Sequence, residues 1–254
     1  MNTTPFPAPS AWRIHALEAW YELLGVLRTP AFAIPSLAFP VVFYVLFAIL
    51  LPGKWGDYEK SAYLLATYGA FGVIGPALFG FGVGLAIERE RGLLELKRVS
   101  PMPAFAYFLA KIAMSLVFGL AVVCLLSIAA IGFGGVRIEP LVWFKLLSVL
   151  LLGTAPFCAL GLLIGTLVKG QAAVAIVNLI YLPMSVLSGL WMPIFVFPAL
   201  VQKLAVVWPA YHLAQMALGV IGQVQGVNYL LHATVLAATT VLLLVVAAYR
   251  LRRL

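Results

Sequence analysis

The residues best suited to recognition lie in one short charged segment, residues 88–101. Positions 88–98 hold three of the chain's eight acids and four of its sixteen basic residues. Gly92 permits a sharp change of direction, and Pro101 ends the short helix that we expect between them. The remaining residues of interest are Glu88, Arg89, Glu90, Arg91, Leu94, Glu95, Lys97 and Arg98. Two interpretations stay open: a helix that docks on a soluble partner, or a charged loop that only fixes topology.

Motifs of common catalytic sites are absent from the sequence. There is no G-x-x-x-x-G-K-[ST], no H-E-x-x-H and no G-x-S-x-G, so we expect neither an ATPase site nor a protease or lipase site in this chain. The histidines at 15, 212 and 232 are too dispersed to suggest a metal site. Cys124 and Cys158 lie in apolar runs, where packing explains them. No basic stripe exists for nucleic-acid phosphates to follow.

The composition requires a membrane. Of 254 residues, 64% are apolar and 9% charged, with a mean hydropathy of +1.10, so the bilayer must serve as solvent. Crossing it takes about 20 mostly apolar residues as a helix. Six stretches qualify, at 30–51, 61–87, 104–133, 141–168, 171–190 and 229–249. Prolines at 35, 40, 76, 156 and 183 are expected to kink these helices.

Charge distribution supports six spans with both ends in the cytoplasm. In that topology the inner segments hold eleven Lys or Arg residues, counting Lys111 as snorkelling from the third span, against five outside. The apolar region 191–228 is broken by Pro193, Pro198, Lys203 and Pro209, and its pieces are too short to span. We expect two short re-entrant or interfacial helices there, near 198–207 and 210–221.

Residues 1–29 are expected to form a cytoplasmic tail and an amphipathic helix. Over 10–28, one helical face holds Trp12, Ala16, Trp20, Leu23 and Leu27, and the opposite face holds His15, Glu18 and Glu22. A helix with two indoles on one face suits the lipid headgroup layer. The predicted fold is therefore an all-α integral membrane protein: an N-terminal amphipathic interfacial helix, six transmembrane helices, and a short re-entrant hairpin between helices 5 and 6.

Candidates for lining a pathway lie in the second and fifth spans. No Asp or Glu falls within the apolar part of any span, which argues against a proton- or sodium-coupled carrier. Asn178 is the polar residue that its own helix is least expected to satisfy, so it either pairs across a helix interface or faces the pathway. Aromatic residues would make a cavity hydrophobic, which favours a hydrophobic or amphipathic cargo. The pathway candidates are Phe71, Phe79, Asn178, Tyr181 and Ser185.

Two stretches resemble a known family. The sequence from Glu88 to Leu96, followed by Ser100 and Pro101, resembles the cytoplasmic signature E-x-E-x-G-T-L-E…S-P of the ABC-2 type transporter permeases; Leu93 replaces the usual threonine. Residues 187–193, and then 198 and 209–213, resemble the segment that closes the fifth span of such permeases and opens an outer re-entrant hairpin. The hairpin residues are Gly189, Pro193, Pro198 and Pro209.

The resemblance implies a permease subunit of an ATP-driven exporter in a bacterial plasma (inner) membrane. Residues 30–254 would form the six-helix domain, 88–101 its coupling helix, and 191–228 its outer hairpin. The partners would be cytoplasmic ABC ATPase subunits, which bind ATP and magnesium, a second copy or related permease, and membrane lipid. Spans two and five would line the dimer interface. The alternative is a secondary transporter or channel that ATP does not drive.

Overall fold

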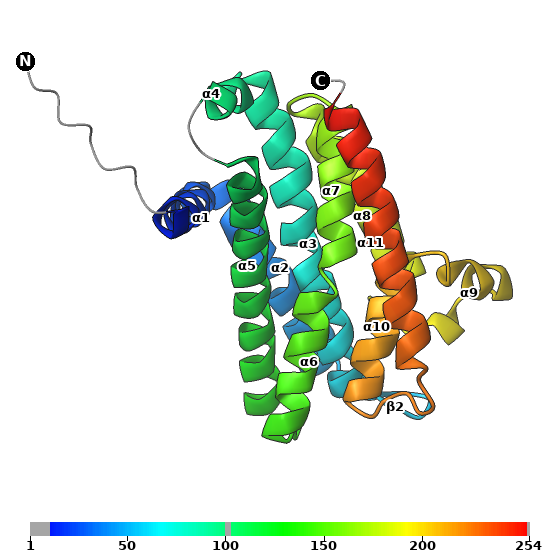
Figure 1. Ribbon diagram of the computed structural model, residues 1–254. Helices are drawn as coiled ribbons and strands as arrows, with labels where there is room; N and C mark the ends of the chain where they lie inside the picture. Colours follow the sequence, from blue (N-terminus) through cyan, green and yellow to red (C-terminus); the bar gives the residue numbers. More distant parts are fainter. Residues whose placement is uncertain (1–10, 100–102, 253–254) are drawn as a thin grey trace, which may run out of the picture.

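The computed structural model describes residues 11–99 and 103–252, and this part of the chain is almost entirely helical. Helices pack lengthwise into one bundle, with α1 lying across its side (Figure 1). Five helical segments in this part are long and apolar enough to cross a membrane. These segments are Pro30–Leu50, Lys60–Glu90, Phe105–Gly132, Pro140–Leu167 and Tyr229–Leu251.

The elements follow in chain order. The first half comprises α1 (Ala11–Leu27), α2 (Pro30–Tyr44), the π-helix η1 (Val45–Leu50), β1 (Lys54–Trp55), β2 (Tyr58–Glu59), α3 (Lys60–Glu90), α4 (Leu93–Val99) and α5 (Ala104–Gly132). The second half comprises α6 (Pro140–Leu152), α7 (Ala155–Leu167), α8 (Ala172–Leu187), the 3-10 helix η2 (Ile194–Val196), α9 (Ala199–Ala205), α10 (Pro209–Val220) and α11 (Tyr229–Leu251). β1 and β2 form a small antiparallel hairpin that the sequence analysis did not predict.

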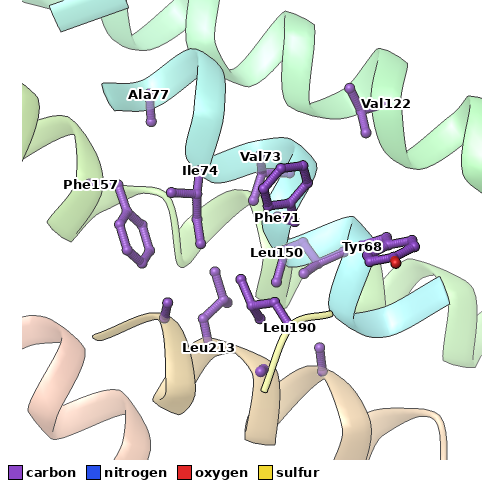
Figure 2. Close-up of a cluster of buried hydrophobic side chains, with 14 of the residues drawn as sticks. Tyr68, Phe71, Val73, Ile74, Ala77, Val122, Leu150, Phe157, Leu190 and Leu213 are labelled. Atoms are coloured by element: carbon purple, nitrogen blue, oxygen red, sulfur yellow. The ribbon is translucent and has the colours of Figure 1, made fainter. Parts of the chain in front are cut away.

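The α3 helix is the centre of the bundle. Every residue from Ser61 to Leu78 is buried, and α3 packs against α2, α5, α7, α8 and α10. Figure 2 shows the middle of this core, where Phe71 and Ile74 of α3 lie near Leu150, Phe157 and Leu213 of other helices. Burial of such large apolar side chains on every side explains why α3 has no polar face.

Two of the predicted spans differ from continuous helices. The fourth breaks at Gly153 and Thr154, and α7 then begins with Pro156 in its first turn. Proline there lacks the N–H that would continue the helix and clashes with the carbonyl four residues earlier, so the helix is interrupted rather than only kinked. The first span keeps Pro35 and Pro40 inside α2 but ends as the π-helix η1.

The fifth predicted span is shorter than expected. α8 has 16 residues, a length of about 24 Å, which is less than the roughly 30 Å of hydrocarbon in a bilayer. It ends because Gly189 takes a φ of 76°, and the N–H of Leu190 then bonds to the carbonyl of Ser185 at 3.0 Å. The apolar run at 171–190 predicts a helix that extends to residue 190.

The α1 helix does not divide its faces as the sequence analysis expected. Trp12 and Trp20 are exposed, but Leu23 turns inward against Met114 and Phe118 of α5. The acidic side does not face water either, because Glu18 and Glu22 pair with lysines of the bundle. Apolar contacts with α5 and ionic contacts together fix α1 against the bundle.

Candidate functional site

The charged segment begins inside α3 rather than in a loop. Glu88 accepts a bond from the Lys111 ammonium, with 2.8 Å between Oε1 and Nζ. Arg89 reaches the end of α7, where its guanidinium donates to the carbonyls of Thr166 at 2.6 Å and Val168 at 2.9 Å. These carbonyls have no partner within their own helix, so Arg89 caps α7. Glu88 and Arg89 therefore hold α3 to its neighbours.

The next residues turn the chain outward. Glu90 lies against Gly170 in the turn between α7 and α8, so closely that a Cβ on this glycine would overlap the carboxylate. Arg91 is exposed, and Gly92 takes a φ of 71°, a conformation that favours glycine. The expected change of direction is present at Gly92. Of the charged residues before it, Glu88 and Arg89 contact neighbouring helices, whereas Arg91 is exposed.

The α4 helix presents an apolar stripe to its surroundings. Leu94 is partly buried against the core, but Leu93, Leu96 and Val99 are 39%, 65% and 84% exposed. Their spacing of three residues places them on one side of the helix. Glu95 is exposed as well. Arg98 belongs to α4, and the predicted terminator Pro101 lies outside the described residues.

Lys111 is fully buried and does not snorkel to the surface as the sequence analysis expected. Its ammonium makes ion pairs with Glu22 of α1 and Glu88 of α3, each at 2.8 Å. It also lies 5.0 Å from the centre of the Tyr107 ring. A buried ammonium needs opposite charge beside it, which these two carboxylates provide. An ionisable residue inside a predicted span was the available signal, but its partners are distant in sequence.

A second feature is an apolar cavity of about 490 Å³ between α2, α3 and α8. Pathway candidates Phe71, Phe79, Asn178 and Tyr181 line it, together with Trp191. Tyr181 stacks on Phe71 with 4.8 Å between ring centres and an interplanar angle of 11°. Its hydroxyl donates to the Phe71 carbonyl at 2.7 Å, which ties α8 to α3 beside the cavity. The volume is in the range of sites that hold drug-sized ligands.

Two polar candidates behave differently from the sequence expectation. The Asn178 amide donates to the carbonyl of Val174, four residues earlier, at 3.0 Å, so its own helix does satisfy it in part. The same side chain lines the cavity. Ser185 is buried, donates to the Tyr181 carbonyl at 2.7 Å and does not line this cavity. Of these two residues, Asn178 alone can contact a molecule in the cavity.

The four candidate hairpin residues mark the ends of short elements. Gly189 ends α8, Pro193 precedes η2, Pro198 precedes α9, and Pro209 begins α10. The Tyr63 hydroxyl donates to the Gly189 carbonyl at 2.7 Å, which joins this region to α3.

A histidine pair also escaped the sequence analysis. His212 of α10 and His232 of α11 approach to 2.8 Å between their Nδ1 atoms, although the sequence suggested that the histidines are dispersed. The second ring nitrogen of His212 donates to the Val206 carbonyl at 2.8 Å. The pair therefore joins the short helices of this region to α11.

Comparison with known proteins identifies the family. A family model described as "ABC-2 type transporter" matches residues 17–221, which run from α1 to the end of α10. A protein of Bacillus subtilis (strain 168) named "Putative transport permease YvfS" is 30% identical over 197 residues, covering 75% of this chain and 78% of that protein. Both matches are to transport components, and the family implies association with ABC ATPase partners. With its membrane-spanning helices, this chain is a multi-pass membrane transport permease and belongs to the ABC-2 type transporter family.

Proposed function

We propose that this chain is the membrane subunit of an ATP-driven exporter. Two permease subunits would form the pathway, and two cytoplasmic ABC ATPase subunits would bind ATP and magnesium and drive it. α8 would complete a set of six spans, its short length extended by Gly189 and the segment that follows. Both chain ends would lie in the cytoplasm of a bacterium, at its plasma (inner) membrane, since the basic residues gather on that side.

The observation that carries this proposal is the exposed stripe on α4. The α4 helix, which carries the exposed Leu96 and Val99, lies at the end of the bundle that also holds the C-terminus of α11 and the turn between α7 and α8 (Figure 1). An exposed apolar stripe flanked by charges, at the end we assign to the cytoplasm, suits a protein partner better than water. We therefore assign α4 as the coupling helix, which receives the movement of the ATPase.

The cavity between α2, α3 and α8 supports the choice of cargo. Its wall is apolar and aromatic, with Asn178 as a polar contact, so it suits a hydrophobic or amphipathic molecule such as a drug, a lipid or a lipid-linked product. Partly exposed residues of α2 and α8 border it. A second copy placed against these helices would enclose a shared pathway, and the short elements of residues 191–228 would form a re-entrant hairpin at its outer end.

The proposal is tested by reconstituting the chain in lipid with each candidate ABC ATPase. Association, ATP hydrolysis and movement of a fluorescent phospholipid analogue and of a lipophilic dye are measured for wild type, Leu96→Glu and Glu95→Arg. We expect both variants to fold normally and to lose association with the ATPase. Glu59→Arg in β2, the same acid-to-base change at an exposed residue at the opposite end of the bundle (Figure 1), should behave as wild type. Association and ATP-driven movement that survive both α4 changes would exclude α4 as the coupling element.

A further inference from the structure

A second cavity, of about 560 Å³, lies between α1, the start of α2 and the last part of α3. We call it the inner cavity, because α3 ends beside it on the side that we assign to the cytoplasm. Along α3 its wall begins at Phe79 and reaches Glu88, roughly 13 Å further along the helix. Its apolar wall includes Phe32, Phe79 and Val83, and its charged residues are Glu18, Glu22, Glu88 and Lys97. The inner cavity is therefore apolar at one end and charged at the other.

The apolar end of the inner cavity meets the apolar cavity described above. Phe32 of α2 and Phe79 of α3 line both cavities, and both side chains are partly exposed. Their ring centres are 6.2 Å apart, and Phe32 also contacts Phe118 of α5 with 6.0 Å between ring centres. Ring contacts of this kind can separate by side-chain rotation without leaving a buried polar group unpartnered. The two rings can therefore divide the cavities in one position and join them in another.

Carboxylates dominate the charged end of the inner cavity. Glu18, Glu22 and Glu88 line it and each side chain stays partly exposed, although each gives one carboxylate oxygen to a lysine. Lys97 lines the cavity, but Lys111 is fully buried and does not. A molecule in the inner cavity thus meets three carboxylates and one ammonium. This wall favours a head group that carries positive charge and donates hydrogen bonds.

We propose that the inner cavity is a binding site for an amphipathic amine, which enters from the cytoplasmic side and passes Phe32 and Phe79 into the apolar cavity. The ammonium group of this cargo binds among Glu18, Glu22 and Glu88, and its apolar part lies against the two rings. The inference deepens the proposed function and rests on it, because the direction of passage assumes an exporter. Among the molecules that suit the apolar cavity, the inner cavity selects those with a cationic end.

Binding is measured first on the permease alone in lipid nanodiscs, with empty nanodiscs as the reference for partitioning into lipid. The probes are a dansyl-labelled long-chain amine and the matched carboxylic acid, which differ only at the charged end. We expect the wild-type chain to bind the amine about tenfold more tightly than the acid. Glu18→Gln removes one carboxylate without changing the size of the side chain, and should lower this preference about threefold.

A second variant fills the inner cavity. Gly25 lines it and has open space around an added Cβ, so Gly25→Phe should weaken amine binding about tenfold without displacing the backbone. Gly132→Phe in α5 is the matched control, because Gly132 has the same open space and lines neither cavity. With the ATPase present, Gly25→Phe should hydrolyse ATP as wild type but lose ATP-driven movement of the amine. Asn178→Trp, which fills the apolar cavity, should also lose movement yet still bind the amine.

The other outcomes separate this inference from the proposed function. Equal binding of the amine and the acid would reject selection by the carboxylates. Amine binding by Gly25→Phe as tight as by the Gly132→Phe control would place the site elsewhere, and wild-type movement despite weakened binding would show that cargo takes another route. A wild-type chain that binds the amine in the inner cavity, but moves it with no ABC ATPase, would instead reject the exporter and leave the binding site standing.

Discussion

Lys111 is the residue on which the ionic contacts of the charged end converge. Its ammonium is fully buried, so its stability depends on the carboxylates of Glu22 and Glu88 rather than on water. Removing one charged residue of this cluster is therefore expected to destabilise the chain more than removing all three. Removing the lysine alone leaves two carboxylates beside each other without a cation, whereas removing all three charges leaves a neutral cluster.

This asymmetry gives the first prediction. Lys111→Met should destabilise the chain by about 3 kcal/mol, the low end for a broken buried ion pair, because it strands two partly buried carboxylates. Adding Glu22→Gln and Glu88→Gln to the same chain should recover most of that loss. The measurement is unfolding of the purified chain in detergent, with Lys145→Met at an exposed lysine as the control. A triple variant less stable than Lys111→Met would refute this account of the site.

Arg89 and Arg91 are two residues apart but have different environments in the structure, so we expect their substitutions to differ in effect. Arg89→Ala removes two charge-assisted bonds to the carbonyls of Thr166 and Val168, so it should lower stability by about 1.5–3 kcal/mol. Arg91→Ala changes an exposed side chain and should leave stability within about 0.5 kcal/mol of wild type. Unfolding of both variants under the same conditions is the measurement. Equal losses would mean that Arg89 does not cap α7.

At the scale of elements, the sequence predicted where helices lie better than where they break. Long apolar runs identify spans because length and hydropathy are local properties. The break before Pro156 and the early end of α8 at Gly189 depend on backbone geometry, which a run of apolar residues conceals. The inward turn of Leu23 was also hidden, since it depends on Met114 and Phe118 of another helix.

Close packing of α3 on α7 gives an element-scale prediction. A Cβ on Gly161 would lie 2.8 Å from the Leu78 carbonyl oxygen and 3.0 Å from the Phe81 Cβ, so two backbones would have to separate. Gly161→Ala should therefore destabilise the chain by about 1–3 kcal/mol. Gly132→Ala in α5 has open space around the new methyl group and should be neutral or slightly stabilising. Unfolding in detergent distinguishes them, and equal behaviour would contradict tight α3–α7 contact.

At the scale of the whole molecule, the candidate site has two parts with different predictability. The charged segment could be located from sequence because its charges are contiguous. The sequence did not show which of these residues contact the bundle and which face outward. The partners of Glu88 and Arg89 lie on α5 and α7, which are distant in sequence. The cavity is lined by residues of α2, α3 and α8. The sequence identified some of its aromatic residues as pathway candidates, but it did not show that the three helices enclose a cavity around them.

The cavity provides the last prediction. Asn178→Trp would place an indole in a cavity of about 490 Å³. Asn178 belongs to α8 and not to α4, which carries the proposed docking surface. We expect the variant to bind the ATPase and hydrolyse ATP in the assembled complex, but to lose movement of the lipophilic dye and of the phospholipid analogue. Val245→Trp adds the same bulk at an exposed position of α11 that does not line the cavity, and should transport as wild type. Transport by Asn178→Trp at the wild-type rate would place the pathway elsewhere in the molecule.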